Sequence, residues 1–449
     1  MSIEAARFPR LGLAPLETRG LDQRESALAR AIYGQVLRRW LTLEWVLGWA
    51  LDRPLGVIEP PLRAVLLAGS AQILLLDRVP DHAAIFESVQ WAKRRVRPGA
   101  GGLVNAVLRR IAGLRGADGR DTTGAGGQAW SDRRDAIPRA DGSAVVLGAE
   151  VLPEDEWVRL SVASSCPPLL LDHWRASFGP ERARVLALHS ICEPPVILNV
   201  AHVRPDQYGP VPGDLLGTHE ADGSRVFVGD RAALLGLLGA RDDVWVQDPG
   251  SSRAVEAIGS PGEGFDPRLI VDLCAGRGTK TRQLAAGWGG AKVLATDADE
   301  RRVEELRAVF AGHERVKAMA MDRVLREAGG RTDLVLLDVP CSNTGVLPRR
   351  VEARYRFGGE ATDRLIREQR RILDAGGSLM APGARLAYST CSLNPAENAD
   401  QARWVARRHG LRLVRQHEHQ PTGVPGDEPG RYSDGSFVAV LESGGRVGR

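Results

Sequence analysis

The sequence has no long hydrophobic run. Its longest apolar stretch, residues 64–76, is interrupted by Gly69, Ser70 and Gln72, whereas a transmembrane helix needs about 20 apolar residues. The first residues contain no apolar segment of the kind found in a secretory leader. We therefore expect neither a membrane anchor nor secretion, and we expect the protein in the cytoplasm.

Cysteine is scarce as well, and the charge is nearly balanced. Five cysteines in 449 residues, an odd number without framework spacing, indicate reduced thiols rather than a disulfide scaffold, and we expect no metal site. The net charge of +4 and pI of about 8.9 permit a polyanionic partner without requiring one. Hydrophobic residues at 43% and charged residues at 26% are typical of a globular protein.

The length and the changes of pattern along the chain predict several parts. Apolar residues recur at helical spacing across residues 22–112, and prolines mark the helix ends. Gly, Asp, Arg, Thr and Ser then replace the periodic pattern, which indicates a linker that cannot bury enough surface to fold. The expected parts are a helical domain at 1–112, a flexible linker at 113–148, a small α/β connector at 149–243 and a Rossmann-like α/β domain at 244–449.

The last part alternates short apolar runs with helical patterns. Strands are expected near 269–273, 293–295, 334–337 and 385–389, with helices between them, followed by a closing pair of strands at 411–414 and 436–441. This alternation predicts a mainly parallel sheet with helices on both faces. In such a sheet, the residues just past the carboxyl ends of the strands line the ligand crevice.

Two cysteines stand at such strand ends. Cys341 follows the run at 334–339, and Cys391 follows the run at 385–390. Most cysteines are small buried hydrophobes, and this is the expected role of Cys166, Cys192 and Cys274. Behind Cys391, the segment 394–397 reads Asn-Pro-Ala-Glu, a helix-start signal that favours a thiolate nearby. From these residues alone, the pair is consistent with either burial or catalysis.

The first strand–helix turn of this domain is rich in small residues. Residues 271–281 read Val-Asp-Leu-Cys-Ala-Gly-Arg-Gly-Thr-Lys-Thr, in which glycines allow close approach of a ligand to the backbone and to a helix N-terminus. The turn matches neither a phosphate loop nor a dinucleotide fingerprint. Asp297 follows the next strand, where a carboxylate can bind ribose hydroxyls. Together these features indicate an adenosine-containing cofactor, and a plain turn with a surface Asp is the alternative.

Two motifs carry a resemblance to a known family. Residues 338–345, Asp-Val-Pro-Cys-Ser-Asn-Thr-Gly, and 389–398, Ser-Thr-Cys-Ser-Leu-Asn-Pro-Ala-Glu-Asn, resemble the paired motifs of the Nop/Sun family of RNA cytosine-C5 methyltransferases. The stretch 102–110, with its basic neighbours at 93–97, is similar to the NusB-type RNA-binding domain fused to bacterial small-subunit ribosomal RNA enzymes of this family. From its charge alone, the basic cluster is typical of a solvated helix face.

The resemblance implies an S-adenosylmethionine-dependent enzyme that methylates cytosine C5 in small-subunit ribosomal RNA. It makes Cys391 the nucleophile that adds to C6 and Cys341 the group that assists release, with Asp338 on the base edge and Lys280 as an active-site cation. The implied cofactor-binding residues are Cys274, Ala275, Gly276, Arg277, Gly278, Thr279, Lys280, Asp297, Asp322 and Asp338. We expect a monomer with ribosomal RNA as its partner.

Some positions depart from the family pattern and leave alternatives open. Arg277-Gly278-Thr279 stands where Pro-Gly-Gly is usual, and Asn343 stands where a Gly is usual. One alternative is a cytosine-C5 methyltransferase that acts on transfer RNA or on another ribosomal RNA. Another is a non-catalytic RNA-binding or assembly factor whose cofactor turn has decayed at Arg277.

Overall fold

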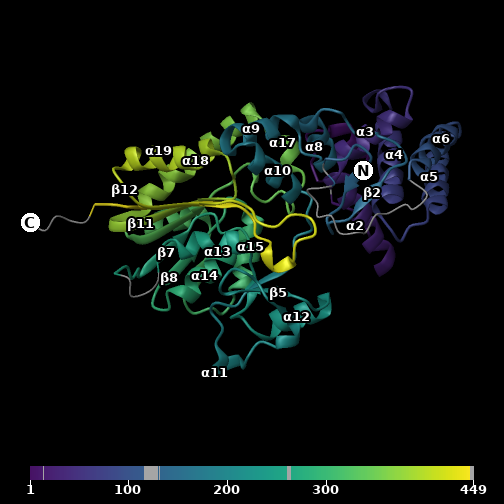
Figure 1. Cartoon of the computed structure of the whole chain (residues 1–449). Coiled ribbons are helices and arrows are strands. Elements are labelled where there is room, and N and C mark those ends of the chain that lie inside the picture. The colour runs from purple at the N-terminus through teal and green to yellow at the C-terminus, as the bar shows by residue number, and fades with distance from the viewer. Residues whose placement is uncertain (14, 116–129, 131, 260–263, 445–449) are drawn as a thin grey trace, which may run out of the picture. The chain divides into compact units, whose positions relative to one another are not determined.

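The computed structural model describes the whole chain except residues 14, 116–129, 131, 260–263 and 445–449 (Figure 1). Its contacts divide the chain into two compact units. Unit 1 comprises Met1–Glu193, Leu347–Gly358 and Gly423–Asp427. Unit 2 comprises Pro194–Val346, Gly359–Thr422 and Glu428–Arg449. The boundary at Glu193 and Pro194 passes through the segment 149–243, which the sequence analysis treats as one connector.

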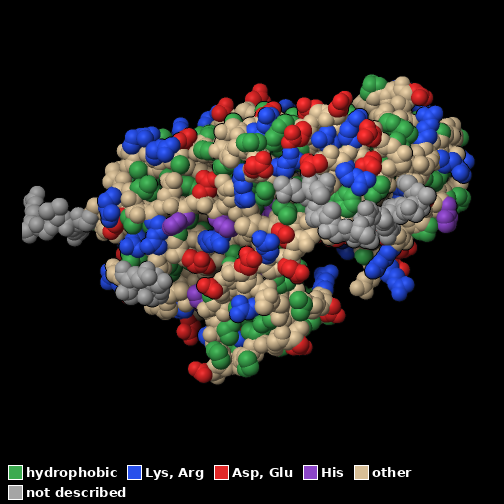
Figure 2. All heavy atoms as spheres, in the orientation of Figure 1, with side chains coloured by type: hydrophobic (Ala, Val, Ile, Leu, Met, Phe, Trp, Pro, Cys, Tyr) green, Lys and Arg blue, Asp and Glu red, His purple; other side chains and the backbone are tan. Residues whose placement is uncertain are grey.

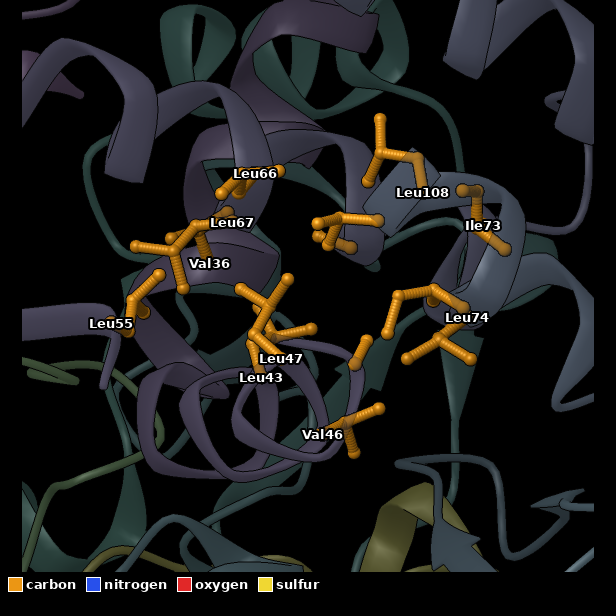
Figure 3. Packing of buried hydrophobic residues seen from close by; sticks show 14 of the residues in the cluster. Val36, Leu43, Val46, Leu47, Leu55, Leu66, Leu67, Ile73, Leu74 and Leu108 are labelled. Atoms are coloured by element: carbon orange, nitrogen blue, oxygen red, sulfur yellow. The ribbon is translucent and has the colours of Figure 1, made fainter. Parts of the chain in front are cut away.

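Unit 1 is mainly helical. Its helices are α1 (Ser2–Arg7), α2 (Gln23–Arg38), α3 (Trp40–Ala50), η1 (Leu55–Val57), α4 (Pro60–Leu75), α5 (Asp81–Arg95), α6 (Ala100–Gly113), α8 (Glu156–Ser164), α9 (Pro168–Phe178), α10 (Pro180–His189) and α17 (Ala353–Arg356). The sequence predicts the helical character of residues 22–112, and the structure confirms it. Leucines, isoleucines and valines from α2, α3, α4 and α6 point toward one another in a shared core (Figure 3).

Local signals explain where these helices begin. Asp22 accepts a hydrogen bond from Glu25 N at 2.8 Å, and the Glu25 carboxylate accepts one from Asp22 N at 2.9 Å, so a capping box starts α2. Pro60 occupies the first turn of α4, where its missing N–H costs nothing. Pro80 immediately precedes α5. The prolines therefore separate the helices as the sequence predicts.

The expected linker contains a small ordered element. β1 (Ala136–Pro138) pairs with β2 (Ala144–Val146) in an antiparallel hairpin. Trp130 is buried in a small cluster with Ala136 and Ala144, and its indole N–H donates to Gly142 O at 2.9 Å. The expectation of a structureless segment is therefore wrong for residues 132–148, because this hairpin buries its own apolar side chains. Residues 116–129 and 131 of the expected linker lie outside the described residues.

Unit 1 also contains a segment that comes from far along the chain. Residues 347–358 include α17, and the Arg354 side chain is fully buried. Its guanidinium donates to Ser164 O at 3.0 Å and to Ser190 O at 2.6 Å. A buried guanidinium is tolerated when its donors find acceptors. Carbonyl groups at the ends of α8 and α10 therefore hold a segment that follows Cys341 by only a few residues.

Unit 2 is built on a seven-stranded sheet in the order β12-β13-β11-β10-β7-β8-β9. The strands are β7 (Leu269–Asp272), β8 (Lys292–Ala295), β9 (Val316–Ala318), β10 (Thr332–Asp338), β11 (Met380–Thr390), β12 (Arg412–His419) and β13 (Ser436–Glu442). β11, β10, β7, β8 and β9 are parallel, β13 runs antiparallel to β11, and β12 at the edge runs antiparallel to β13. The expected Rossmann-like sheet with a closing strand pair is confirmed.

Helices cover both faces of this sheet (Figure 1). They are α13 (Pro249–Glu256), α14 (Thr279–Gly287) and α15 (Glu300–Val309) on one face, and α16 (Met321–Ala328), α18 (Gly359–Leu379) and α19 (Ala399–His409) on the other. Alternation along β10 divides its side chains accordingly: Leu334 and Leu336 pack in the first core, and Val335 and Leu337 pack in the second. The continuous apolar run of β10 thus reflects a strand buried on both sides.

Unit 2 also contains a second, four-stranded sheet, whose strands come before β7 in the sequence. It has the order β4-β5-β3-β6, from β3 (Ile197–Asn199), β4 (Leu216–Gly217), β5 (Ser224–Phe227) and β6 (Trp245–Val246). Its other elements are α11 (Pro205–Tyr208), η2 (Gly213–Leu215) and α12 (Arg231–Ala240). Leu198, Phe227 and Leu237 form its own small core. The α/β character expected for residues 195–243 is present.

The sequence pattern does not indicate β9 or α16. β9 has only three residues, and the middle one, Lys317, is exposed, so it carries too few apolar positions to show a period. Within the described part of the chain, no helix is both long enough and apolar enough to cross a bilayer. On the face shown in Figure 2, basic and acidic side chains are interspersed, so charge alone marks no RNA-binding surface there.

Candidate active site

The two cysteines lie at the carboxyl edge of the parallel sheet. Cys341 follows β10 and Cys391 follows β11 directly, and the parallel pairing of Asp338 with Ser389 places the two strand ends side by side. The Sγ atoms are 3.2 Å apart. The sequence prediction that both thiols stand on one rim is therefore confirmed by the register of two neighbouring strands.

The environments of the two thiols differ. Cys341 is buried, whereas Cys391 is partly exposed. Its hydrogen bond to Cys391, its burial and the nearby Glu397 carboxylate raise the pKa of the Cys341 thiol well above its usual value. A thiol held protonated is a poor nucleophile. Of the pair, Cys391 is thus the more exposed thiol and Cys341 is the one held protonated.

A partly buried ion pair lies near Cys391. Lys280 Nζ donates to Asp338 Oδ2 at 2.7 Å, and the two side chains are 14% and 32% exposed. Burial disfavours the lysine cation, but the Asp338 carboxylate outweighs this and raises the pKa of Lys280 above its usual 10.5. Lys280 sits in the first turn of α14 and Asp338 ends β10. Neighbouring strands β7 and β10 therefore bring together two residues 58 positions apart in the sequence.

Asn343 occupies a strained position between the cysteines. Its φ is 59°, in the left-handed region where glycine is favoured and asparagine is the best-tolerated alternative. The side-chain amide donates to Cys341 O at 2.8 Å and accepts from Cys391 Sγ at 3.2 Å. The departure from glycine is therefore accommodated by the backbone, and it places an amide group against Cys391.

The turn between β7 and α14 has the open backbone that a cofactor requires. Gly276 has a φ of 55°, and a Cβ placed there would meet no atom within 4 Å. Gly278 precedes α14 with a φ of 80° and lies against Phe310 and Leu306, so it provides the sharp turn and Gly276 provides the open space. Arg277 is exposed, so its side chain does not fill the turn. The turn can therefore accommodate a nucleoside even though Arg277-Gly278-Thr279 replaces the Pro-Gly-Gly that is usual in the family.

The two acidic residues expected at the cofactor lie in different settings. Asp297 follows β8 and is 9% exposed, and its carboxylate accepts from Gly276 N and Asp299 N, both at 3.0 Å. It therefore joins the loops after β7 and β8 and still has room for a further donor. Asp322, in the first turn of α16, is exposed and forms an ion pair with Arg326 at 2.7 Å.

Asp272, the last residue of β7, lies beside the site without any sequence signal that marks it as part of it. It is buried, and it accepts a hydrogen bond from Thr281 Oγ1 at 2.7 Å. Burial raises the pKa of this carboxyl from 3.8 to about 7. Between these values the unfolded chain ionises Asp272 while the folded protein keeps it protonated, so the contribution of this group to stability falls as the pH rises.

We expect Asp272→Asn to remove this dependence. Relative to the variant, the wild type should lose up to about 4 kcal/mol of stability between pH 4 and pH 7.5, with no further change above that. Thermal unfolding of both proteins at pH 4.5 and 7.5, followed by circular dichroism, measures the difference. A difference between the two proteins that does not vary with pH would contradict the predicted ionisation.

The segment behind Cys391 is only partly what the sequence indicates. Asn394 accepts from Ala396 N at 3.1 Å and caps a single 3₁₀ turn, η3 (Pro395–Glu397). The expected longer helix begins only at α19, and Glu397 does not complete a capping box. Its carboxylate instead contacts the loops that carry the two cysteines. A sequence can place a Glu at a helix start, but it does not reveal a partner some 55 residues away.

The basic cluster of the helical domain is exposed. Lys93, Arg94 and Arg95 form the last turn of α5, where cations are favoured by the helix dipole. Arg110 forms an ion pair with Asp52 at 3.6 Å. Among residues 1–444, apart from the gaps named above, no group of three His, Cys, Asp or Glu side chains is placed to hold a metal ion.

Comparison with known proteins finds a matching family for each of two segments of the chain. Residues 263–441 match the model of the 16S rRNA methyltransferase RsmB/F family, and residues 5–113 match that of the NusB family. The ribosomal RNA small subunit methyltransferase B of Erwinia tasmaniensis is 27% identical over 95% of this chain and 92% of its own length. The protein of the same name from Salmonella paratyphi C is 28% identical over 96% and 93%.

Two solved structures share the fold. PH0851 superposes with a TM-score of 0.66 and 19% identity over 95% of this chain and 92% of its own. A methyltransferase homologue from Pyrococcus horikoshii gives a TM-score of 0.51 and 20% identity over 65% of this chain and all of its own. A NusB-family domain thus precedes a Rossmann-like domain that matches the RsmB/F family of 16S rRNA methyltransferases, and the chain is an RNA methyltransferase that uses S-adenosylmethionine.

Proposed function

We propose that the protein methylates C5 of a cytosine in small-subunit ribosomal RNA through a covalent bond between Cys391 and C6 of the base. The observation that carries this proposal is the thiol pair, 3.2 Å apart, beside the Lys280–Asp338 ion pair and the glycine-rich turn. The names of the relatives, which act on small-subunit ribosomal RNA, support the choice of substrate. We place the reaction in the cytoplasm and the enzyme in a monomeric state.

The chemistry explains why a thiol is needed. Cytosine C5 is a weak nucleophile, and addition of a thiolate to C6 turns it into an enamine-like carbon. S-adenosylmethionine supplies the methyl group that this carbon takes up. Loss of the C5 proton and cleavage of the C6–S bond then restore the thiolate and release 5-methylcytosine. One difficult substitution becomes three easier steps, as in covalent catalysis generally.

Cys391 is the proposed nucleophile because it is the more exposed thiol. Cys341, buried and with a raised pKa, is suited to act as a protonated thiol that assists the departure of the base. Asp338 has one oxygen engaged by Lys280, which leaves the other for the base edge near N3. Lys280 provides a fixed positive charge where electron density accumulates during addition.

The cofactor is proposed to lie along the turn formed by Cys274, Ala275, Gly276, Arg277, Gly278, Thr279 and Lys280, with Asp338 at its methyl-donor end. Asp297 would bind the ribose hydroxyls, and Asp322 would lie near the adenine. The positive φ angles of Gly276 and Gly278 support the first assignment. The exposure of Arg277 supports a turn that still has room for the cofactor.

The target base must leave its stack before C6 can be attacked. We therefore expect the enzyme to prefer a cytosine in an unpaired region. The NusB-family domain and its basic residues at 93–97 are proposed to hold the surrounding RNA by its phosphates. Binding should weaken as salt concentration rises.

A mechanism-based trap tests the proposal. In small-subunit ribosomal RNA transcribed with 5-fluorocytidine, C5 carries no proton to remove, so the adduct should persist after methyl transfer. We expect a denaturant-resistant protein–RNA band with S-adenosylmethionine, and none with unmodified RNA. Nucleoside mass spectrometry of unmodified RNA should then find 5-methylcytosine.

Other outcomes would redirect the assignment. A methyl group on another atom of the base or on the ribose, without a trapped adduct, would contradict the covalent route. Trapping and methylation of transfer RNA but not of ribosomal RNA would keep the chemistry and change the substrate. RNA binding without measurable cofactor binding would point to a binding or assembly factor.

A further inference from the structure

A buried carboxylate bonds to both loops that carry the cysteines, and the loops also contact each other through Ser342 Oγ and Ser392 Oγ, 2.9 Å apart. Glu397 is fully buried. Its Oε1 accepts from Ser342 N at 2.8 Å, and its Oε2 accepts from Ser342 Oγ at 2.5 Å and from Ser392 Oγ at 2.7 Å. Ser342 directly follows Cys341 and Ser392 directly follows Cys391. The same side chain therefore holds the residue next to each thiol.

The carboxylate is fully satisfied in this position. Gln369 Nε2, from α18, donates to Oε1 at 3.2 Å and to Pro340 O at 3.0 Å. Four donors thus meet the four lone-pair sites of the carboxylate. A buried carboxylate is costly when its oxygens lack donors and is stable when they are occupied. The four donors need two acceptor oxygens at position 397. A glutamine there would offer one oxygen, and an alanine would offer none.

Further contacts fix the support of Glu397. The Tyr388 hydroxyl donates to Glu397 O at 2.5 Å. Asn398 accepts from Thr390 Oγ1 at 2.6 Å and donates to Ser392 O at 2.9 Å. The end of β11, η3 and the loop after β10 are therefore held by one hydrogen-bond network. Of the side chains of Glu397, Tyr388 and Asn398, Glu397 is the one that bonds to both Ser342 and Ser392.

We propose that Glu397 is a positioning residue that clamps the two cysteine loops and fixes the separation of the thiols. This inference rests on the proposed function, in which Cys391 forms the adduct and Cys341 assists its release. Formation needs one thiol beside the base, whereas release needs both thiols in register. Loosening the clamp should therefore impair release more than formation, and adduct should accumulate.

A purely structural role makes a different prediction. If Glu397 only stabilised the fold, its replacement would lower the unfolding temperature and the amount of active enzyme without changing the balance between adduct formation and release. Thr332→Val provides the matched control. Thr332 is also fully buried and donates to Ala328 O at 3.1 Å, but it lies at the opposite end of β10 from the cysteines.

Cross-linking measures the thiol separation without reference to activity. Diamide oxidises two neighbouring thiols to a disulfide and is itself reduced to the hydrazine, taking up both hydrogens. Peptide mapping should find rapid Cys341–Cys391 cross-linking in the wild type and in Thr332→Val. In Glu397→Gln and Glu397→Ala we expect it to be about 10-fold to 100-fold slower, because small displacements have large effects on such rates.

Kinetics on ribosomal RNA provide the second readout. For Glu397→Gln we expect steady-state turnover to fall more than single-turnover methyl transfer, with a denaturant-resistant adduct accumulating, and Glu397→Asp to restore part of the turnover. If Gln and Ala variants do not fold, Ser342→Ala and Ser392→Ala remove one donor each and should show the same changes to a smaller degree.

The outcomes separate the clamp from the proposed reaction. Wild-type cross-linking rates in folded Glu397 variants would overturn the clamp whatever reaction the enzyme performs. Slower cross-linking with turnover and adduct level unchanged would overturn the link to release. Slower cross-linking in the variants, with no adduct in any protein including wild type, would leave the clamp in place and contradict the covalent route.

Discussion

Cys391→Ser should abolish methyl transfer, with a loss of at least about 10⁴-fold, because a nucleophile acts in a step that no neighbour can perform for it. A serine hydroxyl has almost the size of the thiol but is scarcely ionised at neutral pH. The variant should form no adduct with ribosomal RNA. Labelled RNA, S-adenosylmethionine and denaturing gels measure both effects in one experiment.

Cys341→Ser should behave in the opposite way. With the nucleophile present and the release group removed, the adduct should form and accumulate. Cys192→Ser is the matched control, since this cysteine is buried in unit 1, and it should retain wild-type turnover. The reverse pattern, with adduct in Cys391→Ser and none in Cys341→Ser, would exchange the two roles.

Asp338→Asn should lower turnover by about 10²- to 10³-fold, within the range of a lost acid–base or charge-stabilising group. The amide matches the carboxylate in size but cannot neutralise Lys280 at 2.7 Å, and it cannot favour a positive charge at N3 of the base. The RNA dissociation constant should change little, because the lost carboxylate acts in the reaction and does not bind the RNA phosphates. Turnover assays and filter binding separate the two quantities.

Asp333→Asn is the control for this prediction. Asp333 lies near the amino end of the same strand, β10, where its carboxylate accepts from Arg268 N at 2.8 Å and Leu269 N at 2.9 Å. An amide oxygen can still accept these bonds, so turnover should remain near wild type. Turnover of Asp338→Asn within about fivefold of wild type would argue against the proposed role, since acid–base groups usually contribute far more.

The strongly patterned parts of the fold were predictable from sequence. The helical period over residues 22–112 and the apolar runs that become β7, β10 and β11 are long or regular enough to show their structure. The weaker elements were not. β9 has three residues, and the β1–β2 hairpin lies in a segment poor in periodic apolar residues, so local composition carried no signal for their pairing.

The sequence by itself determined which residues stand at or just beyond the strand ends: the two cysteines, Asp338 and the glycine-rich turn that leads to Lys280 in the following helix. Tertiary structure alone decided that Cys341 is buried beside a more exposed Cys391, that Lys280 meets Asp338, and that Glu397 reaches the serines after both cysteines. The reason is physical. Position along a strand follows from local periodicity, whereas burial and hydrogen-bond partners depend on the pairing of strands that are distant in the chain.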